Sequence, residues 1–220
     1  MSRGEESVAS RCSEMANEYD RSKDAQGWRG PEVVFGLTYA FVEPGQSVLD
    51  IGIGTGLGSV LFHKAGLDVF GMDMSPEMLD VCRNKGFAKD LKVHDLNEAP
   101  YPYASATLDH AVCAGVLNHF EDLGPMFHET SRILRAGGVF AFVVAHRRIG
   151  ESSDFQVQHA DTRVTMFRHG EEQIGALLRE NGLDLLRELE FPVSGHAEGE
   201  TPLLLKAYAA RRRPRSEHMG

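Results

Sequence analysis

A short glycine-rich segment holds the residues of this chain whose types and spacing are most suited to chemistry. Three alternate glycines, Gly52, Gly54 and Gly56, follow the apolar run Ser47–Ile51. Glycine lets a backbone turn tightly and lets a ligand approach it closely. Asp50 lies two residues before the first glycine, where a carboxylate would repel a pyrophosphate and favour a cationic amine. A glycine-rich turn alone also fits an ordinary connection between a strand and a helix.

The spacing of these glycines excludes two common phosphate-binding motifs. A G-x-G-x-x-G pattern would need a third glycine where the chain has Leu57 or, one glycine later, Ser59. The P-loop is also absent, because no Gly-Lys-Ser/Thr sequence follows. The motif therefore argues against a nicotinamide-dependent dehydrogenase.

A second acid, Asp73, ends the predicted strand Asp68–Met72 and lies 23 residues after Asp50. A carboxylate at this place can accept hydrogen bonds from both hydroxyls of a ribose, although it also fits a turn residue before a helix. Met74 could lie against an adenine ring or pack in the core. The two acids together favour an adenosine that carries a cationic amino acid and no phosphate, as S-adenosylmethionine does.

Six segments in the same order and near the same spacing resemble those of a known family. The sequence is similar to the class I S-adenosylmethionine-dependent methyltransferases, in particular the ubiquinone/menaquinone-biosynthesis-type group that acts on small molecules. The segments are Leu49–Gly56, Gly71–Leu79, His94–Leu96, Leu108–Val112, Leu117–Phe120 and Ile133–Gly138. The chain departs from the family at Ile53, where a small residue is common, and in the turn 101–105, where an aspartate is usual.

The resemblance implies a set of residues that bind the cofactor S-adenosylmethionine. Around the methionine portion it places Asp50, Gly52, Gly54 and Gly56. Around the adenosine and the sulfonium it places Asp73, Met74, Asp95, Leu96, Ala114 and Gly115. Family relatives also place an N-terminal tyrosine over the cofactor, which here would be Tyr19, although a buried structural tyrosine fits as well.

Methyl transfer from a sulfonium needs alignment and desolvation more than a reactive side chain, but a base helps when the acceptor carries a proton. His119, after the fourth predicted strand, is the first candidate because histidine titrates near neutrality. A histidine that closes the loop or packs on the cofactor would look the same. His146 and His159 are weaker candidates. Trp28 and Arg29 could line the acceptor pocket or form a surface helix cap.

Strand-like and helix-like segments alternate along the chain and must position these residues. We expect an α/β fold with a doubly wound, mostly parallel seven-stranded sheet, of the Rossmann-like methyltransferase type, with a final antiparallel strand. Ligands in such sheets bind beyond the carboxyl ends of the strands. Expected strands are Ser47–Ile51, Asp68–Met72, Leu91–His94, Leu108–Ala114, Val139–Ala145, Leu183–Phe191 and Leu203–Tyr208. Expected helices run over 56–65, from Pro76 to Gly86, from Pro125 to Gly137 and over 171–181.

The same alternation predicts the organisation of the domain. Residues 1–43 are expected to form an N-terminal helical cap and residues 44–210 the S-adenosylmethionine-binding methyltransferase domain. Within it, the polar segment 146–169 is expected to be an insertion on the acceptor side. Residues 211–220, which begin with an arginine cluster, are expected to form a disordered tail.

Composition limits the possible partners. The 220 residues carry a formal net charge of −9, which argues against nucleic acid as a partner. The longest apolar stretch is too short to cross a membrane, and no secretory signal is visible. Three cysteines without a C-x-x-C pair indicate reduced thiols in the cytoplasm and no metal site. The oligomeric state is open.

These observations predict an enzyme that transfers a methyl group from S-adenosylmethionine to a small-molecule substrate by in-line displacement, leaving S-adenosylhomocysteine. Its acceptor atom remains open among oxygen, nitrogen, carbon and sulfur. The alternative is a catalytically silent S-adenosylmethionine-binding sensor or partner subunit. Aminopropyl or carboxymethyl transfer is a third possibility, and the latter would need an arginine at the sulfonium that the sequence does not identify.

Overall fold

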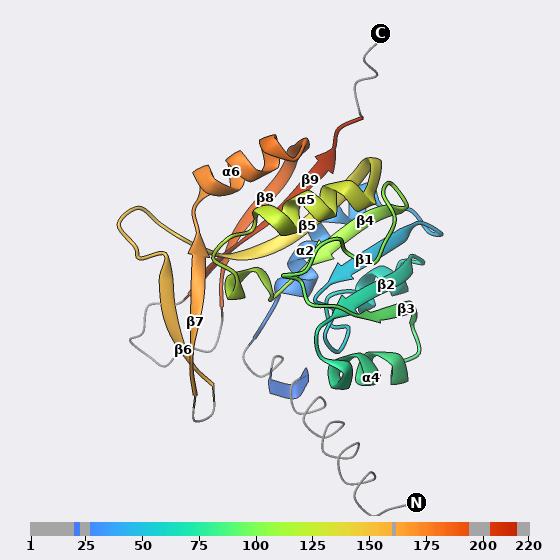
Figure 1. Ribbon diagram of the computed structural model, residues 1–220, viewed down its shortest axis with the longest axis horizontal. Helices are drawn as coiled ribbons and strands as arrows, with labels where there is room; N and C mark the ends of the chain where they lie inside the picture. The colour runs from blue at the N-terminus through green and yellow to red at the C-terminus, as the bar shows by residue number, and fades with distance from the viewer. Residues whose placement is uncertain (1–19, 23–26, 160–161, 194–202, 215–220) are drawn as a thin grey trace, which may run out of the picture.

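The computed structural model describes residues 20–22, 27–159, 162–193 and 203–214, and these form a central sheet with helices on both faces (Figure 1). Five parallel strands lie in the order β3-β2-β1-β4-β5. β9 pairs antiparallel with β5, and β8 pairs antiparallel with β9. The strands are β1 (Ser47–Ile51), β2 (Asp68–Asp73), β3 (Ala88–Val93), β4 (Leu108–Cys113), β5 (Leu134–His146), β8 (Leu183–Pro192) and β9 (Leu204–Arg212). The predicted mostly parallel sheet with a final antiparallel strand is confirmed.

Two further strands form a hairpin that the sequence did not predict. β6 (Asp154–His159) and β7 (Thr162–His169) pair with each other, and β7 joins the far end of β5 through only two residue pairs. Figure 1 shows the hairpin projecting from the side of the main sheet. It lies within the segment 146–169 that was expected to be an insertion.

The helices divide the core into two layers, one on each face of the sheet. α2 (Gly30–Thr38), α3 (Val60–Lys64) and α4 (Pro76–Asn84) contribute buried side chains to one layer. α5 (Gly124–Ile133) and α6 (Glu171–Glu180) contribute to the other. Residues 139–146 of β5 are all buried, as the continuous apolar run of a central parallel strand predicts.

Helix α4 shows how directly local sequence can set an element. Its N-cap is Ser75, whose hydroxyl accepts a hydrogen bond from the Met78 amide at 3.2 Å, and Pro76 occupies the first helical position. Its inner face buries Leu79 and Cys82. The predicted start of this helix at Pro76 agrees with the structure.

Other element boundaries differ from the prediction for identifiable reasons. α3 begins at Val60 instead of Gly56, because Gly56 has a φ of +92°, which a right-handed helix cannot contain. α5 ends at Ile133 and β5 begins at Leu134, so the glycine pair does not end the helix. Gly137, with a φ of +83°, instead bends the strand, and Gly138 passes too close to the Asp109 carbonyl for any side chain.

The arginine cluster at the C-terminus is partly structural. β9 extends to Arg212, so the first two residues of the expected tail lie in the sheet. Arg212 is buried, and its guanidinium donates a hydrogen bond to the Leu134 carbonyl. This bond joins the last strand to the start of β5. The prediction of a disordered tail from residue 211 onward is therefore wrong for Arg212.

Candidate cofactor and acceptor site

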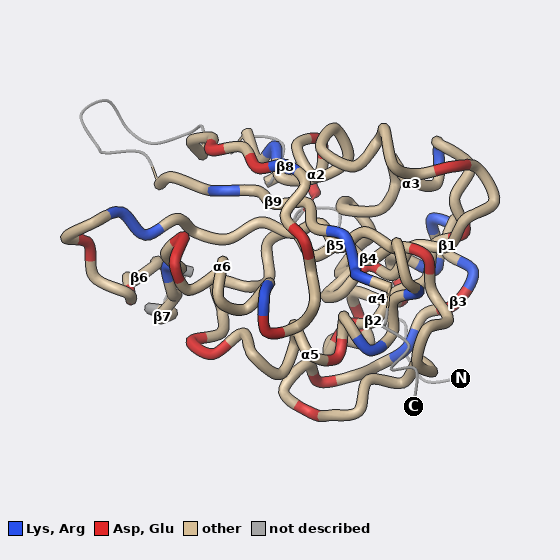
Figure 2. Tube along the Cα trace, turned by 90° about the horizontal axis from the view of Figure 1, so that it is seen from above, with Lys and Arg blue, Asp and Glu red and all other residues tan. Residues whose placement is uncertain are grey.

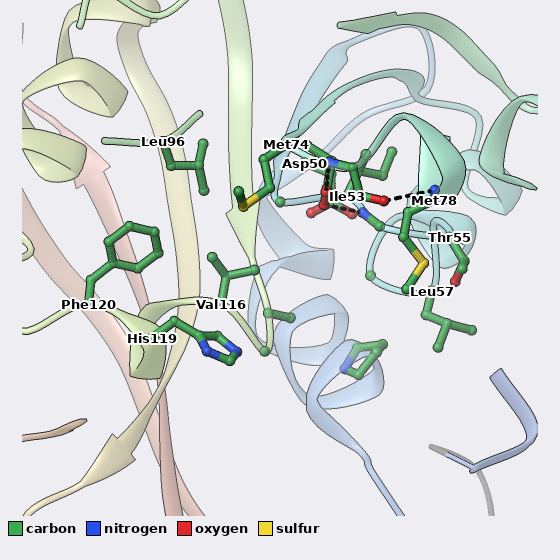
Figure 3. Close-up of a pocket in the computed structure, with 18 of the residues that line it drawn as sticks. Asp50, Ile53, Thr55, Leu57, Met74, Met78, Leu96, Val116, His119 and Phe120 are labelled. Carbon is green, nitrogen blue, oxygen red and sulfur yellow. Dashed lines mark hydrogen bonds between the residues drawn. The ribbon is translucent and has the colours of Figure 1, made fainter. Parts of the chain in front are cut away.

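A cavity of about 530 Å³ opens at the carboxyl ends of β1, β2 and β4 (Figure 3). The structure brings most of the predicted cofactor residues to its wall. They are Asp50, Gly52, Gly54, Asp73, Met74, Asp95, Leu96, Ala114 and Gly115. The predicted base, His119, also lines it. Tyr19 lies outside the described residues, and Gly56 does not line the cavity.

Asp50 is the most deeply buried acid of this wall, with 2% of its surface exposed. Burial raises the pKa of its carboxyl to about 7, the nearby Ser59 hydroxyl opposes this rise, and the charge of Asp73 adds to it. Its Oδ2 atom makes no hydrogen bond to the described residues. A buried carboxylate oxygen without a partner is suited to a ligand that brings a cationic N–H donor.

Two glycines leave the space that this arrangement requires. A Cβ at Gly58 would lie 2.8 Å from Oδ2 of Asp50, so a side chain there would cover the free oxygen. A Cβ at Gly52, where φ is +74°, would lie 2.4 Å from Cγ2 of Val116. Gly56 has a different role, because a side chain there would collide with Phe87 and Cys82 beneath the loop. Both Gly52 and Gly58 line the cavity, and the sequence pattern included Gly52 but not Gly58.

Asp73 is held in place by two backbone amides. Its Oδ2 accepts a hydrogen bond from Gly54 N and its Oδ1 accepts one from Ser75 N, both at 2.9 Å. Each carboxylate oxygen can accept more than one hydrogen bond. The side chain is therefore oriented at the cavity wall with acceptor capacity left for two hydroxyls of a ribose.

The opposite end of the cavity is lined by the apolar side chains of Met74 and Leu96 and by the carboxylate of Asp95. Met74 is 68% exposed, which excludes a place in the core, and Figure 3 shows it and Leu96 projecting into the cavity. Asp95 accepts hydrogen bonds from the backbone N and the Nδ2 of Asn97, each at 2.9 Å, and these bonds hold its pKa below the usual value. The carboxylate thus remains charged and oriented, ready to accept from an exocyclic amine.

Trp28, His119 and Phe120 form the remaining side of the cavity, which we call the acceptor side. The indole of Trp28 lies over Gly115, since a Cβ at that glycine would be 3.4 Å from Cζ2 of the ring. His119 ends the 3₁₀ turn η2 (Leu117–His119), and Figure 3 shows His119 and Phe120 at one wall. Arg29 lies outside this cavity, where it pairs with Glu32 at 3.5 Å.

Of the other two candidate histidines, only His146 has a described side chain, and it does not line the cavity. His146 is buried under α6, with Nε2 at 3.4 Å from Oε2 of Glu190 and 3.9 Å from Oε1 of Glu171. The side chain of His159 lies outside the described part of the chain. His119 is therefore the histidine that lines the cavity among the described residues.

Some wall residues carry little signal in the sequence. Val116 and Leu57 line the cavity but lie outside the segments that carry the resemblance, whereas Thr55 and Phe120 lie within such segments and were assigned no role. Asn97 could have been recognised, since an Asp-x-Asn pair two residues apart forms an Asx turn that fixes the acid. Thr55 is further tied to the N-terminal segment, where its hydroxyl donates to Oδ1 of Asp20 at 2.5 Å.

The pKa of Asp50 predicts that ligand affinity depends on pH. A cationic amine binds the charged carboxylate, so the Kd of S-adenosylhomocysteine should rise about tenfold per unit as pH falls below about 7. Calorimetry between pH 5.5 and 8.5, in buffers of different ionisation enthalpy, would measure both the affinity and the protons released. Asp50→Asn should bind more weakly at pH 8 and lose this dependence. An equal slope in both proteins would contradict the assignment.

The stability of the ligand-free protein should have the opposite pH dependence. Between the usual carboxyl pKa of 3.8 and about 7 the folded state binds more protons than the unfolded state. The contribution of Asp50 to stability therefore falls as pH rises through this window. Asp50→Asn should melt at a higher temperature than the parent at pH 8 and show a smaller difference at pH 5, measured by calorimetric unfolding. A lower melting temperature at pH 8 would be inconsistent with an unpaired buried carboxylate.

A methyl group at Gly30 should displace Trp28 from the cavity. A Cβ at Gly30 would lie 2.3 Å from Cζ2 of the indole, whereas a Cβ at Gly36 in the same helix would meet nothing within 4 Å. Because Trp28 is the chain's single tryptophan, its fluorescence reports on the cavity directly. Gly30→Ala should shift the emission to longer wavelength and weaken its response to S-adenosylhomocysteine. Gly36→Ala should leave both unchanged and add up to about 1 kcal/mol of helix stability. Identical spectra for the two variants would refute the placement.

The fold and the site together define a class of protein. A doubly wound sheet has at its switch point a cavity with one acid at each of two neighbouring strand ends, joined by a glycine loop without a phosphate motif. This arrangement is that of a Rossmann-like fold, and its acids are suited to an adenosine that carries a cationic group.

Comparison with known proteins relates part of the chain to methyltransferases. Residues 49–142 match the family model described as "Methyltransferase domain". The chain is 33% identical over 137 residues to malonyl-[acyl-carrier protein] O-methyltransferase of Serratia marcescens, covering 62% of this chain and 52% of that protein. It is 27% identical over 131 residues to demethylmenaquinone methyltransferase of Tropheryma whipplei, covering 56% and 53%. The chain thus spans about half the length of these curated relatives.

Solved structures show the same fold. A SAM-dependent methyltransferase from Methanosarcina mazei matches with a TM-score of 0.68 and 16% identity, covering 80% of this chain and 97% of that chain. This likeness shows the fold, and the match to the methyltransferase-domain model covers residues 49–142. None of the helices in the described residues combines the length and the apolar composition needed to cross a membrane.

Proposed function

We propose that this protein transfers a methyl group from S-adenosylmethionine to a small molecule that enters on the acceptor side. Two carboxylates of the cavity carry the proposal. The first is Asp50, whose buried Oδ2 has no hydrogen-bond partner among the described residues, and the second is Asp73, which also lines the cavity. The first is suited to the ammonium of the methionine portion and the second to the ribose hydroxyls. The residues present therefore fit the cofactor at both of its polar ends.

When bound, S-adenosylmethionine supplies a methyl group on a cationic sulfur, and the carbon–sulfur bond breaks with its electron pair staying on sulfur. Asp50 would hold the ammonium of the cofactor and Asp73 its ribose hydroxyls, which would leave the sulfonium toward the acceptor side. Ala114 and Gly115 present bare backbone there, and Trp28 covers it from outside. Such alignment is worth up to about 7–11 kcal/mol of the barrier.

His119 is proposed to take the acceptor's proton as the new bond to carbon forms. It lines the acceptor side beside Phe120, and no lysine or arginine among the described residues lines the same cavity. That apolar and aromatic surrounding supports a neutral acceptor with an ionisable hydroxyl, amine or carbon acid. By their names, the relatives described above methylate malonyl-[acyl-carrier protein] and demethylmenaquinone, two acceptors of different chemistry.

Charge supports a small-molecule acceptor over nucleic acid. Figure 2 shows Lys and Arg interspersed with Asp and Glu along the described chain instead of gathered in one basic region. A nucleic-acid methyltransferase would need a continuous basic face to bind phosphates. The same proposal includes action in the cytoplasm. It also includes a helical cap over residues 1–43, a methyltransferase domain over residues 44–210, and a role for segment 146–169 on the acceptor side.

The test is binding followed by turnover. Calorimetry with S-adenosylhomocysteine should show binding at one site per chain. Incubation with S-adenosylmethionine and a library of phenols, quinols, amines and acyl thioesters should then release S-adenosylhomocysteine with at least one acceptor. Binding without release for any acceptor would favour the sensor or partner-subunit alternative. Absence of binding would reject both.

A further inference from the structure

The hairpin β6–β7 contacts the short turn that carries the acceptor-side residues. η2 lies between Val116 and Phe120, and three residues of this segment, Val116, His119 and Phe120, line the cavity. Within the described residues, β7 packs against η2 through side-chain contacts that no sequence motif predicts.

The first contact is made by His169, the last residue of β7. Its ring is almost fully buried, with 1% of its surface exposed, and Nε2 lies 3.3 Å from the Leu117 carbonyl oxygen. Since a carbonyl oxygen can only accept, Nε2 carries the hydrogen. Burial, the largest effect, lowers the pKa of this histidine, although the carbonyls of Leu117 and Phe120 and the Gln173 side chain beside it act in the other direction.

A second contact supports the first. The Nδ2 of Asn118 donates to the sulfur of Met166 at 3.2 Å, so two consecutive residues of η2 are held by the same strand. Two backbone bonds close η2, from His119 N to Val116 O at 2.9 Å and from Phe120 N to Leu117 O at 3.2 Å. Isolated 3₁₀ turns of this length have poor hydrogen-bond geometry and little stability of their own.

His169 itself is anchored on the main sheet. It pairs with His146 in the parallel register of β5 and β7, and its carbonyl accepts a hydrogen bond from Arg147 N at 3.1 Å. α6 begins two residues later, with Ile174 N donating to Gly170 O at 3.0 Å. The ring thus projects from a fixed strand end toward a turn that has few bonds of its own.

We propose that His169 is a positioning residue that holds η2 through the Leu117 carbonyl and thereby sets where His119 and Phe120 meet the acceptor. The effect of His169 on catalysis rests on the proposed function above. The structural part of the proposal, that His169 orders η2, does not depend on that function.

The test compares two replacements of similar size. His169→Gln can place an amide N–H near the position of Nε2, whereas His169→Leu fills the space without a donor. Hydrogen exchange of peptides covering 116–121 should be about five- to tenfold faster in His169→Leu than in the parent protein, the factor expected for one neutral hydrogen bond. Exchange in His169→Gln should stay within twofold of the parent. Peptides from β1 and β4 serve as internal references and should not change in either variant.

A spectroscopic readout separates positioning from general loosening. The imidazole carbon–proton signal of His119, assigned by its loss in His119→Gln, should move in His169→Leu and return in His169→Gln. Equal exchange and equal His119 signals in the two variants would overturn the proposal, as would faster exchange spread over the whole sheet. Calorimetry with S-adenosylhomocysteine on the same proteins tests the proposed function separately. Binding should be within threefold in all three, because His169 does not line the cavity.

Discussion

Replacing Asp73 with alanine is expected to weaken the binding of S-adenosylhomocysteine by about 100-fold or more. The carboxylate is proposed to accept two hydrogen bonds from ribose hydroxyls, and bonds to a charged group contribute about 1.5–3 kcal/mol each. It also orients the glycine loop through Gly54 N and the turn through Ser75 N. Calorimetric titration of parent and variant at pH 8, where Asp50 is charged, measures the loss.

Two further variants make this result interpretable. Asp68 lies at the opposite end of β2, pairs with Lys89 on the surface and is remote from the cavity, so Asp68→Ala should change the affinity less than twofold. Asp73→Asn keeps a side-chain oxygen that can accept from one backbone amide, and it should fold with a melting temperature close to that of the parent. If Asp73→Asn folded normally and bound as tightly as the parent protein, the assignment of the cofactor site would be wrong.

Replacing His119 with alanine is expected to lower kcat for methyl transfer by about 100-fold or more, since a general base contributes about 10²–10⁴-fold. The Kd of S-adenosylhomocysteine should remain within threefold, because the proposed contacts of the cofactor are made by Asp50, Asp73 and Asp95. The rate of S-adenosylhomocysteine release, measured with an acceptor identified by the library assay, gives kcat.

His128 provides the matched control for this variant. It lies exposed on α5 outside the cavity, so His128→Ala should leave kcat unchanged. His119→Gln, which cannot take a proton, should lose as much activity as His119→Ala. Full activity in His119→Gln would show that the residue closes the loop or packs on the cofactor instead of acting as a base.

Local sequence predicted much of the fold because several elements depend on short-range interactions. Ser75 and Pro76 start α4 wherever it packs, since the cap bond and the fixed φ of proline are local. The apolar run 139–145 becomes a buried central strand because only a strand covered on both faces of the sheet buries all of its side chains. The acids Asp50 and Asp73 meet at one edge because parallel neighbouring strands end on the same side.

Other features depended on contacts between distant residues. The two glycines 137 and 138 have the pattern of a helix end, yet pairing of Leu134 with Leu108 and the bond from Arg212 extend β5 back past them. Gly56 belongs to the glycine pattern but faces Phe87 and Cys82 instead of the cavity. The polar segment after β5 gave no periodic signal for the hairpin, whose strands are paired mainly with each other.

The sequence by itself therefore determined the type of sheet, the glycine loop without a phosphate-binding motif, and the acids at two neighbouring strand ends. These properties follow from the types and the spacing of residues within short segments of the sequence. Tertiary structure alone decided that Asp50 is buried, which raises its pKa to about 7, that Trp28 covers Gly115, and that His169 contacts η2. Burial and contacts between segments far apart in the chain depend on how whole layers pack, and no local pattern encodes them.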